Sequence, residues 1–226
     1  MIVKKPFLFV VITFVLAGML AGCAGTPVET PGGQAEGKYG GTFRLAITES
    51  PKNLNPAHAN DTSSMRVVYQ LFDTLVSIDS EGEVVPNLAD SWDISEDGLV
   101  YTFKLKEGVK FHATTEGGME TANGGREVTA EDWVWTFNYI TDPNTNSARA
   151  YFIDMVKGYN DYREGKADAL AGVTAKDDYT LQIELEHNFS PFITVLAYNT
   201  FLCASQGGRG EMGGGLWPAP GGYRPL

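Results

Sequence analysis

The side chains that most often carry enzyme chemistry are scattered along this chain without the spacing that catalysis or metal binding requires. The three histidines, His58, His112 and His187, are isolated, and none forms an H-x-x-H or H-x-x-x-H pair that could begin a zinc site. The chain has no G-x-S-x-G turn, no P-loop, and no G-x-G-x-x-G placed between a strand and a helix. The sequence therefore predicts that the protein is not an enzyme and has no catalytic residues, no metal and no cofactor.

The remaining polar features fit structure or solubility better than chemistry. The adjacent acidic pairs Glu131-Asp132 and Asp177-Asp178 are typical of a helix start and a turn, not of acid–base catalysis. Cys203 lies in an apolar stretch, and we interpret it as buried or incidental. The net charge of −11 leaves no basic patch for phosphates, which argues against nucleic acid as a partner. Binding of a solute or a protein is the class of function that remains.

The first 38 residues read as an export signal followed by a linker. Lys4 and Lys5 precede an apolar run over residues 6–20, the layout of a secretory signal peptide. The run ends in the string L-A-G-C, which resembles a bacterial lipobox. We therefore predict a lipoprotein signal peptide over 1–22, lipid attachment at Cys23, and anchoring to the outer face of the cell membrane. The alternative is a signal peptide with an incidental cysteine. Residues 23–38, rich in Gly, Pro, Thr and Glu, are expected to form a flexible tether.

Two segments alternate between apolar and polar residues in the manner of half-buried strands. Leu99, Tyr101, Phe103 and Leu105 share one face of the first, and the second runs over residues 179–185 with the same period. We expect these two strands to share a sheet. A third strand is predicted over 42–47. Upstream of the first segment, residues 86–92 suggest a short amphipathic turn.

Helical spacing and capping residues predict four helices. The first begins at Asp61 or Thr62, and the second begins at Thr129, forms a capping box with Asp132, and ends at Asp142-Pro143. A third is predicted over residues 151–162, closed by Gly165. The last helix is predicted over 192–201, with Ser190 and Pro191 as N-cap and first helical residue.

Several of these segments carry strings that together resemble one family. The central stretch reads P-x-L-A-x-S-W and then D-G-x-x-Y-T-F-x-L-x-x-G-V-K-F-H, residues 40–46 read G-G-T-F-R-L-A, and residues 129–137 read T-A-E-D-W-V-W-T-F. These strings resemble the extracellular solute-binding proteins of family 5, the dipeptide, oligopeptide and nickel receptors of ABC importers. The resemblance implies an α/β fold of the periplasmic-binding-protein-like class (type II, with mixed sheets). Residues 39–75 would start lobe I and residues 76–200 would form the extra subdomain of this family.

The same resemblance implies the function and the partners. The expected role is the substrate-binding component of an ABC importer, which captures peptides outside the membrane and delivers them to the permease. The expected partners are a peptide or other small solute and the permease subunits, and the expected state is a monomer. The loop after the first strand forms part of the ligand cleft in such proteins, which makes Glu49 and Ser50 the candidate ligand contacts. The alternative is a lipid-anchored interaction module with no transport role.

The resemblance stops near Phe201. The last twenty residues, 207–226, hold eight glycines and three prolines, a composition that cannot offset the entropy of ordering a packed core. Members of the family are more than twice as long and continue here into a second lobe. We therefore interpret residues 201–226 as the product of a frameshift or a truncation, with a natural flexible tail as the alternative.

Overall fold

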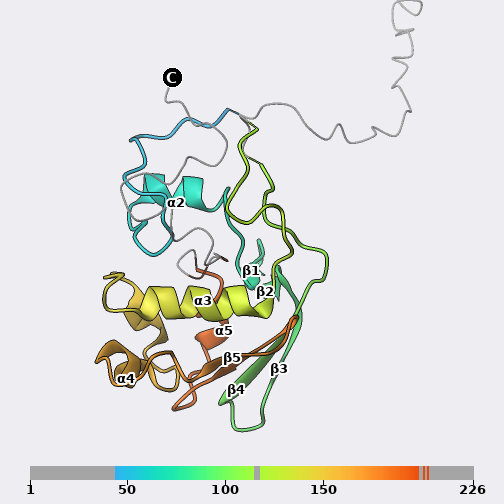
Figure 1. Ribbon diagram of the computed structural model, residues 1–226, viewed down its shortest axis with the longest axis vertical. Coiled ribbons are helices and arrows are strands. Elements are labelled where there is room, and N and C mark those ends of the chain that lie inside the picture. The colour runs from blue at the N-terminus through green and yellow to red at the C-terminus, as the bar shows by residue number, and fades with distance from the viewer. Residues whose placement is uncertain (1–43, 115–117, 199–200, 202, 204–226) are drawn as a thin grey trace, which may run out of the picture. The chain divides into compact units, whose positions relative to one another are not determined.

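The computed structural model describes residues 44–114, 118–198, 201 and 203 (Figure 1). The chain divides between Leu45 and Ala46, and the fold below is that of the described residues from Ala46 onward. Residues 42 and 43 of the predicted first strand lie outside the described part, and residues 44–47 form no strand. That prediction is wrong for 44–47, because a strand needs a neighbour for its backbone hydrogen bonds and no described segment pairs with them.

The described elements are helices and two antiparallel sheets. In chain order they are α2 (Thr62–Val68), β1 (Val76–Ile78), β2 (Val84–Pro86), β3 (Ala89–Ile94), β4 (Val100–Leu105), α3 (Ala130–Thr141), the 3₁₀ helix η2 (Ala150–Ile153), α4 (Tyr159–Arg163), β5 (Val173–Asp177), β6 (Thr180–Glu184) and α5 (Phe192–Val195). Strands β1 and β2 form a small sheet, and the larger sheet has the order β3-β4-β6-β5. The expected α/β class is confirmed.

The larger sheet is built on the two alternating segments that the sequence identifies. In β4, Tyr101, Phe103 and Leu105 are buried, whereas Lys104 is exposed. Strand β6 pairs with β4 in register, with Tyr101 opposite Ile183 and Phe103 opposite Leu181. The predicted pairing of these two strands is therefore confirmed. The predicted turn at 86–92 is instead mostly strand β3, because its backbone pairs with β4 from Ala89 onward.

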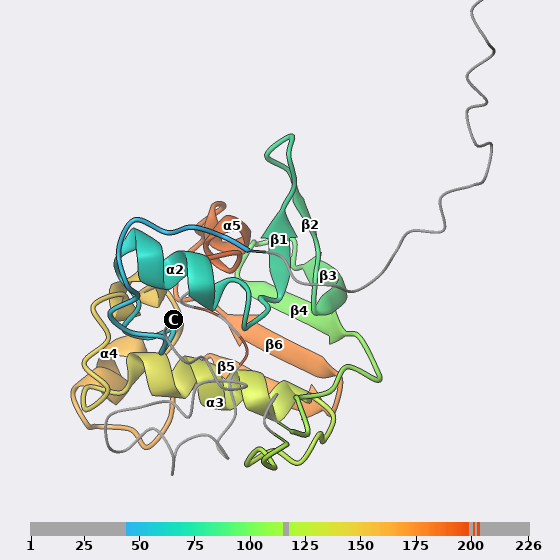
Figure 2. The same ribbon diagram turned by 90° about the horizontal axis from the view of Figure 1, so that it is seen from above.

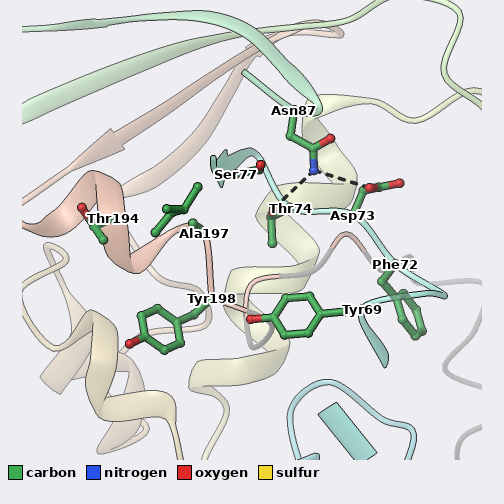
Figure 3. Close-up of a pocket in the computed structure, with 10 residues that line it drawn as sticks. Tyr69, Phe72, Asp73, Thr74, Ser77, Asn87, Thr194, Ala197 and Tyr198 are labelled. Atoms are coloured by element: carbon green, nitrogen blue, oxygen red, sulfur yellow. Dashed lines mark hydrogen bonds between the residues drawn. The ribbon is translucent and has the colours of Figure 1, made fainter. Parts of the chain in front are cut away.

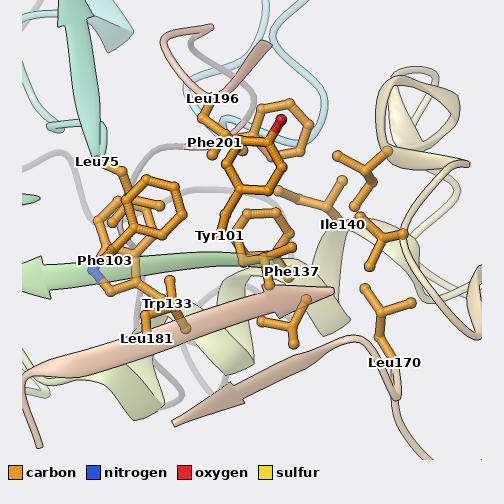
Figure 4. Packing of buried hydrophobic residues seen from close by; sticks show 14 of the residues in the cluster. Leu75, Tyr101, Phe103, Trp133, Phe137, Ile140, Leu170, Leu181, Leu196 and Phe201 are labelled. Carbon is orange, nitrogen blue, oxygen red and sulfur yellow. The ribbon is translucent and has the colours of Figure 1, made fainter. Parts of the chain in front are cut away.

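Helix α3 lies alongside β5 and β6 and closes the core (Figure 2). Its residues Trp133, Phe137 and Ile140 are buried against the sheet (Figure 4). Phe137 stacks on Phe201 with ring centroids 5.5 Å apart. On the same core, Tyr101 meets Phe192 of α5 edge to face at 5.0 Å, a geometry that adds to the stabilisation from buried area.

The ends of α3 follow the sequence. The carboxylate of Asp132 accepts a hydrogen bond from the backbone N–H of Thr129 at 3.0 Å, as the predicted capping box requires. The helix ends before Asp142. Asp132 also forms a two-pronged ion pair with Arg126, whose guanidinium lies 4.9 Å from the centre of the Phe111 ring. The acidic residue at this helix start therefore has a structural role.

The predicted helix over 151–162 is instead two short helices, η2 and α4. Gly158 separates them with a positive φ of 78°. Between them Val156 bridges to Leu185, and the N–H of Lys157 donates to Glu184 at 3.0 Å. These bonds to the end of β6 need an extended backbone, which a continuous helix cannot provide. Gly165, with φ of 71°, follows the end of α4 as predicted.

The chain enters the region of the two sheets near Asp73 and leaves it near Cys203, and these two points lie side by side. The backbone N–H of Cys203 donates to the carbonyl of Asp73 at 2.8 Å, just before β1. Helix α5 lies against β1 and ends at Val195, earlier than the predicted Phe201. Its N-cap is Pro191, one residue after the predicted Ser190. The segments around Asp73 and Cys203 are therefore neighbours.

Candidate functional site

Glu49 and Ser50, the candidate ligand contacts, are both exposed in the loop that precedes α2. The residues that follow them are held firmly. The hydroxyl of Ser64, fully buried in α2, accepts hydrogen bonds from the backbone N–H groups of Lys52 at 2.9 Å and Asn53 at 3.1 Å. A loop presented in this way can offer a carboxylate to a ligand, because its base does not have to be ordered on binding.

The same serine completes the start of α2. Asp61 is the N-cap, and its carboxylate accepts from the Ser64 N–H at 2.9 Å and from the Ser64 hydroxyl at 2.6 Å. These two hydrogen bonds favour the ionised form and lower the pKa of the Asp61 carboxyl. Ser64 therefore links the helix cap to the loop that carries Glu49 and Ser50.

Two further hydrogen bonds tie this loop to the part of the chain around α3. The side-chain amide of buried Asn55 donates to the Tyr139 hydroxyl at 2.7 Å. The Ser147 hydroxyl donates to the carbonyl of Ala57 at 2.8 Å. Trp135, one turn before Tyr139 on α3, stacks on that tyrosine with ring centroids 4.9 Å apart. The loop is thus tied at Asn55 and Ala57 to α3 and to the segment that follows it.

A separate hollow of about 480 Å³ lies where the chain enters and leaves the sheet region (Figure 3). The described residues that line it come from the end of α2 to β1, from the connection between β2 and β3, and from the region of α5: Tyr69, Phe72, Asp73, Thr74, Ser77, Ile78, Asn87, Thr194, Ala197 and Tyr198. This volume is in the range of small-molecule sites, and the mixture of aromatic rings with a few polar groups is typical of them. It includes neither Glu49 nor Ser50.

One side of the hollow is polar and well ordered. The amide nitrogen of Asn87 points to the Asp73 carboxylate at 3.4 Å and to the Thr74 hydroxyl at 3.3 Å (Figure 3). The Thr74 hydroxyl in turn donates to the carbonyl of Val76 at 2.6 Å. Among the described lining residues, Asp73 is the sole carboxylate and none carries a basic side chain. This side of the hollow therefore favours a cation.

The opposite side is aromatic. Tyr69 and Tyr198 are each 44% exposed. Tyr198 stacks on Phe152 with ring centroids 5.7 Å apart, and Phe152 contacts Tyr151 at 4.6 Å. This chain of rings holds the Tyr198 ring in place. Sequence reasoning missed these residues, because Tyr69 follows the end of α2 and Tyr198 fell inside a predicted helix.

The described residues contain no cluster of three His, Cys, Asp or Glu side chains able to hold a metal ion. His112 and His187 are exposed and His58 is half-buried. Cys203 is buried, in agreement with one of the two interpretations made from the sequence. Burial raises the pKa of its thiol well above the ordinary value. A thiol in that state is a poor nucleophile.

The predicted signal peptide, Cys23 and the tether lie outside the described residues, and so does most of the predicted tail over 201–226. Within the described ranges, no helix has the length and apolar character needed to cross a membrane. These predictions therefore stay predictions, as do the domain boundaries at residues 75 and 200.

Comparison with known proteins supplies the family. A model of the bacterial extracellular solute-binding proteins, family 5 (middle region), matches residues 83–211. The oligopeptide-binding protein OppA of Bacillus subtilis is 33% identical over 203 residues, which cover 88% of this chain and 35% of that protein. The chain thus spans about a third of the length of this relative.

Solved structures agree with the fold. A periplasmic oligopeptide-binding protein from Borrelia burgdorferi matches 76% of this chain and 33% of its own chain, with a TM-score of 0.63 and 32% identity. Listeria monocytogenes OppA bound to peptide matches 70% of this chain and 30% of its own chain, with a TM-score of 0.59 and 30% identity. The match of the family model to more than half of the chain and the shared fold lead to one conclusion: this chain belongs to the bacterial extracellular solute-binding proteins of family 5.

Proposed function

We propose that this chain serves as the substrate-binding component of an ABC importer that captures peptides of the di- or oligopeptide class outside the membrane. The observation that carries the proposal is the 33% identity with an oligopeptide-binding protein over 88% of this chain. The fold shared with peptide-binding structures at 30% identity or more supports it. Delivery to membrane permease subunits is the expected next step.

The physical basis is differential affinity between an open and a closed form. A ligand that contacts both lobes stabilises the closed form, which the permease then recognises. The described residues would supply one wall of such a cleft, so we expect them not to close around a ligand by themselves. On that wall Glu49 and Ser50 are the proposed contacts, with the Glu49 carboxylate paired to the amino terminus of the peptide.

Uptake of a labelled peptide tests this function in the cell. Deleting the gene should lower uptake of short peptides, and a copy whose reading frame continues through the second lobe should restore it. Glu49→Gln should restore it less well, whereas Glu81→Gln, in the exposed turn between β1 and β2, should restore it fully. Unchanged uptake after deletion would contradict the transport role and favour the alternative, an anchored module that binds another partner and transports nothing.

The proposed route to the cell surface rests on Cys23. Export through a lipoprotein signal and acylation at this residue would place the chain on the outer face of the membrane, as a monomer on a tether. Cells grown with a labelled fatty acid should label the wild-type protein, and Cys23→Ala should abolish the label and release the protein from the membrane fraction. Membrane retention of the alanine variant would contradict lipid anchoring through this cysteine.

The proposal that this is a truncated or frameshifted copy has its own test. The DNA sequence across codons 200–230 and beyond should show a continuation of the family in another reading frame. A confirmed stop with no such continuation would favour a natural tail over residues 201–226.

A further inference from the structure

The hollow between the end of α2, β1 and α5 is distinct from the loop of Glu49 and Ser50, and the proposed peptide contacts do not involve it. We propose that it is a second binding site, which takes a protonated amine carried on an aromatic or aliphatic body. In a peptide such a group is a lysine side chain or an amino-terminal apolar residue. Only that application to peptides rests on the proposed function.

The charge of the site comes from Asp73. Its carboxylate is exposed, and Asn87 approaches one of its oxygens, Oδ1, at 3.4 Å. The other oxygen, Oδ2, has no hydrogen-bond partner among the described residues. An ammonium group placed there would form a charge-assisted hydrogen bond, the stronger class of such bonds.

The position of this carboxylate is fixed by the backbone around it. The carbonyl of Asp73 accepts from Cys203 at 2.8 Å, and the carbonyl of the next residue, Thr74, accepts from Leu88 at 3.1 Å. The Asn87 amide reaches both Asp73 and the Thr74 side chain, so its own orientation is set. Little ordering is left for a ligand to impose, and this lowers the cost of binding.

The body of the ligand fits the other side of the hollow. Tyr69 and Tyr198 present half-exposed rings across from Asp73 (Figure 3). Ile78, which also lines the hollow, adds an apolar side chain that is 44% exposed. Aromatic faces attract both apolar groups and cations. Tyr198 is held by its stack on Phe152, so this wall is also preformed. A carboxylate facing aromatic rings therefore selects an apolar amine over an uncharged molecule of the same shape.

The test compares phenethylamine with 2-phenylethanol, which has a similar shape and no charge, using NMR titration of the full chain. The amine should bind about tenfold more tightly than the alcohol and should shift the signals of Ser77 and Asn87. Asp73→Asn should remove this preference, and Tyr198→Ala should weaken both probes. Asp93→Asn, an exposed carboxylate on β3 away from the hollow, is the matched control and should leave binding unchanged. Equal affinity for the two probes, or an amine preference that survives in Asp73→Asn, would overturn the proposal.

Peptide probes separate this proposal from the proposed function. One peptide has a free amino terminus on phenylalanine, another is acetylated and carries a lysine, and a third is acetylated and uncharged. If phenethylamine binds in the hollow while no peptide binds or is taken up, the peptide function fails and the amine site stands. If peptides bind or are taken up while phenethylamine does not bind in the hollow, the amine site fails and the peptide function stands.

Discussion

Asn55 and Tyr139 join two segments that are far apart in the sequence, because the amide of Asn55 donates to the Tyr139 hydroxyl at 2.7 Å. Asn55 is 8% exposed, so loss of its partner leaves a buried polar group less well satisfied. Tyr139→Phe should therefore lower the free energy of unfolding by about 1–3 kcal/mol, measured by urea denaturation. Tyr151→Phe, on a ring that is 59% exposed, is the control and should change it by less than about 0.5 kcal/mol. Equal effects of the two changes would contradict the role given to this bond.

Ser64 lowers the pKa of the Asp61 carboxyl through two hydrogen bonds. A carboxyl with a lowered pKa in the folded state adds stability above its unfolded pKa of about 3.9, and this is lost as the pH falls through the folded pKa. Ser64→Ala should raise the pKa of Asp61 in an NMR titration. The stability of the variant should also depend less on pH below about 4.

Ser95→Ala is the matched control for that prediction. The Ser95 hydroxyl donates to Asp97 at 2.5 Å and lowers the pKa of that carboxyl in the same way. Removal of this hydroxyl should raise the pKa of Asp97 and leave the pKa of Asp61 unchanged. Faster hydrogen exchange at Lys52 and Asn53 is expected in Ser64→Ala alone, since both lose their acceptor there.

Residue 172 must be glycine because backbone atoms of other residues lie close to it on several sides. A Cβ at this position would lie 2.6 Å from the carbonyl oxygen of Glu184 and 2.9 Å from both the nitrogen and the oxygen of Lys157. Gly172→Ala should destabilise the protein by about 3 kcal/mol, because backbone cannot move aside as a side chain can. At Gly82 a Cβ would meet no atom within 4 Å, so Gly82→Ala should cost only the strain of its positive φ, about 1–2 kcal/mol. Thermal denaturation of the two variants would reveal the difference.

The buried thiol of Cys203 should resist modification in the folded protein. Burial raises its pKa, so the reactive thiolate is scarce at pH 8, and the solvent has little access to the sulfur. Mass spectrometry after iodoacetamide treatment should find this residue unlabelled in buffer and labelled in urea. Rapid labelling in buffer would show that the bond from its N–H to Asp73 opens readily.

Predictions from the sequence were correct where the structure depends on neighbouring residues. They were wrong or missing where the structure depends on contacts with a distant segment. The alternation around Tyr101 fixes one buried face whatever its neighbours are, and Thr129 with Asp132 caps α3 within one turn. The break at Gly158 could not be read in the same way, because it depends on bonds from Lys157 to Glu184. The hollow was missed for a similar reason: Tyr69 and Tyr198 come together only through the packing of α5 on β1.

The hydrogen bond between Cys203 and Asp73 places the entrance and the exit of the sheet region side by side. A segment whose two ends meet can be inserted into another chain, or removed from one, without pulling the flanking residues apart. Residues 74–202 thus meet the geometric condition for a transplantable unit. A short linker across the two ends would allow new termini in an exposed turn such as that at Gly82, giving a circularly permuted protein with the same sheet.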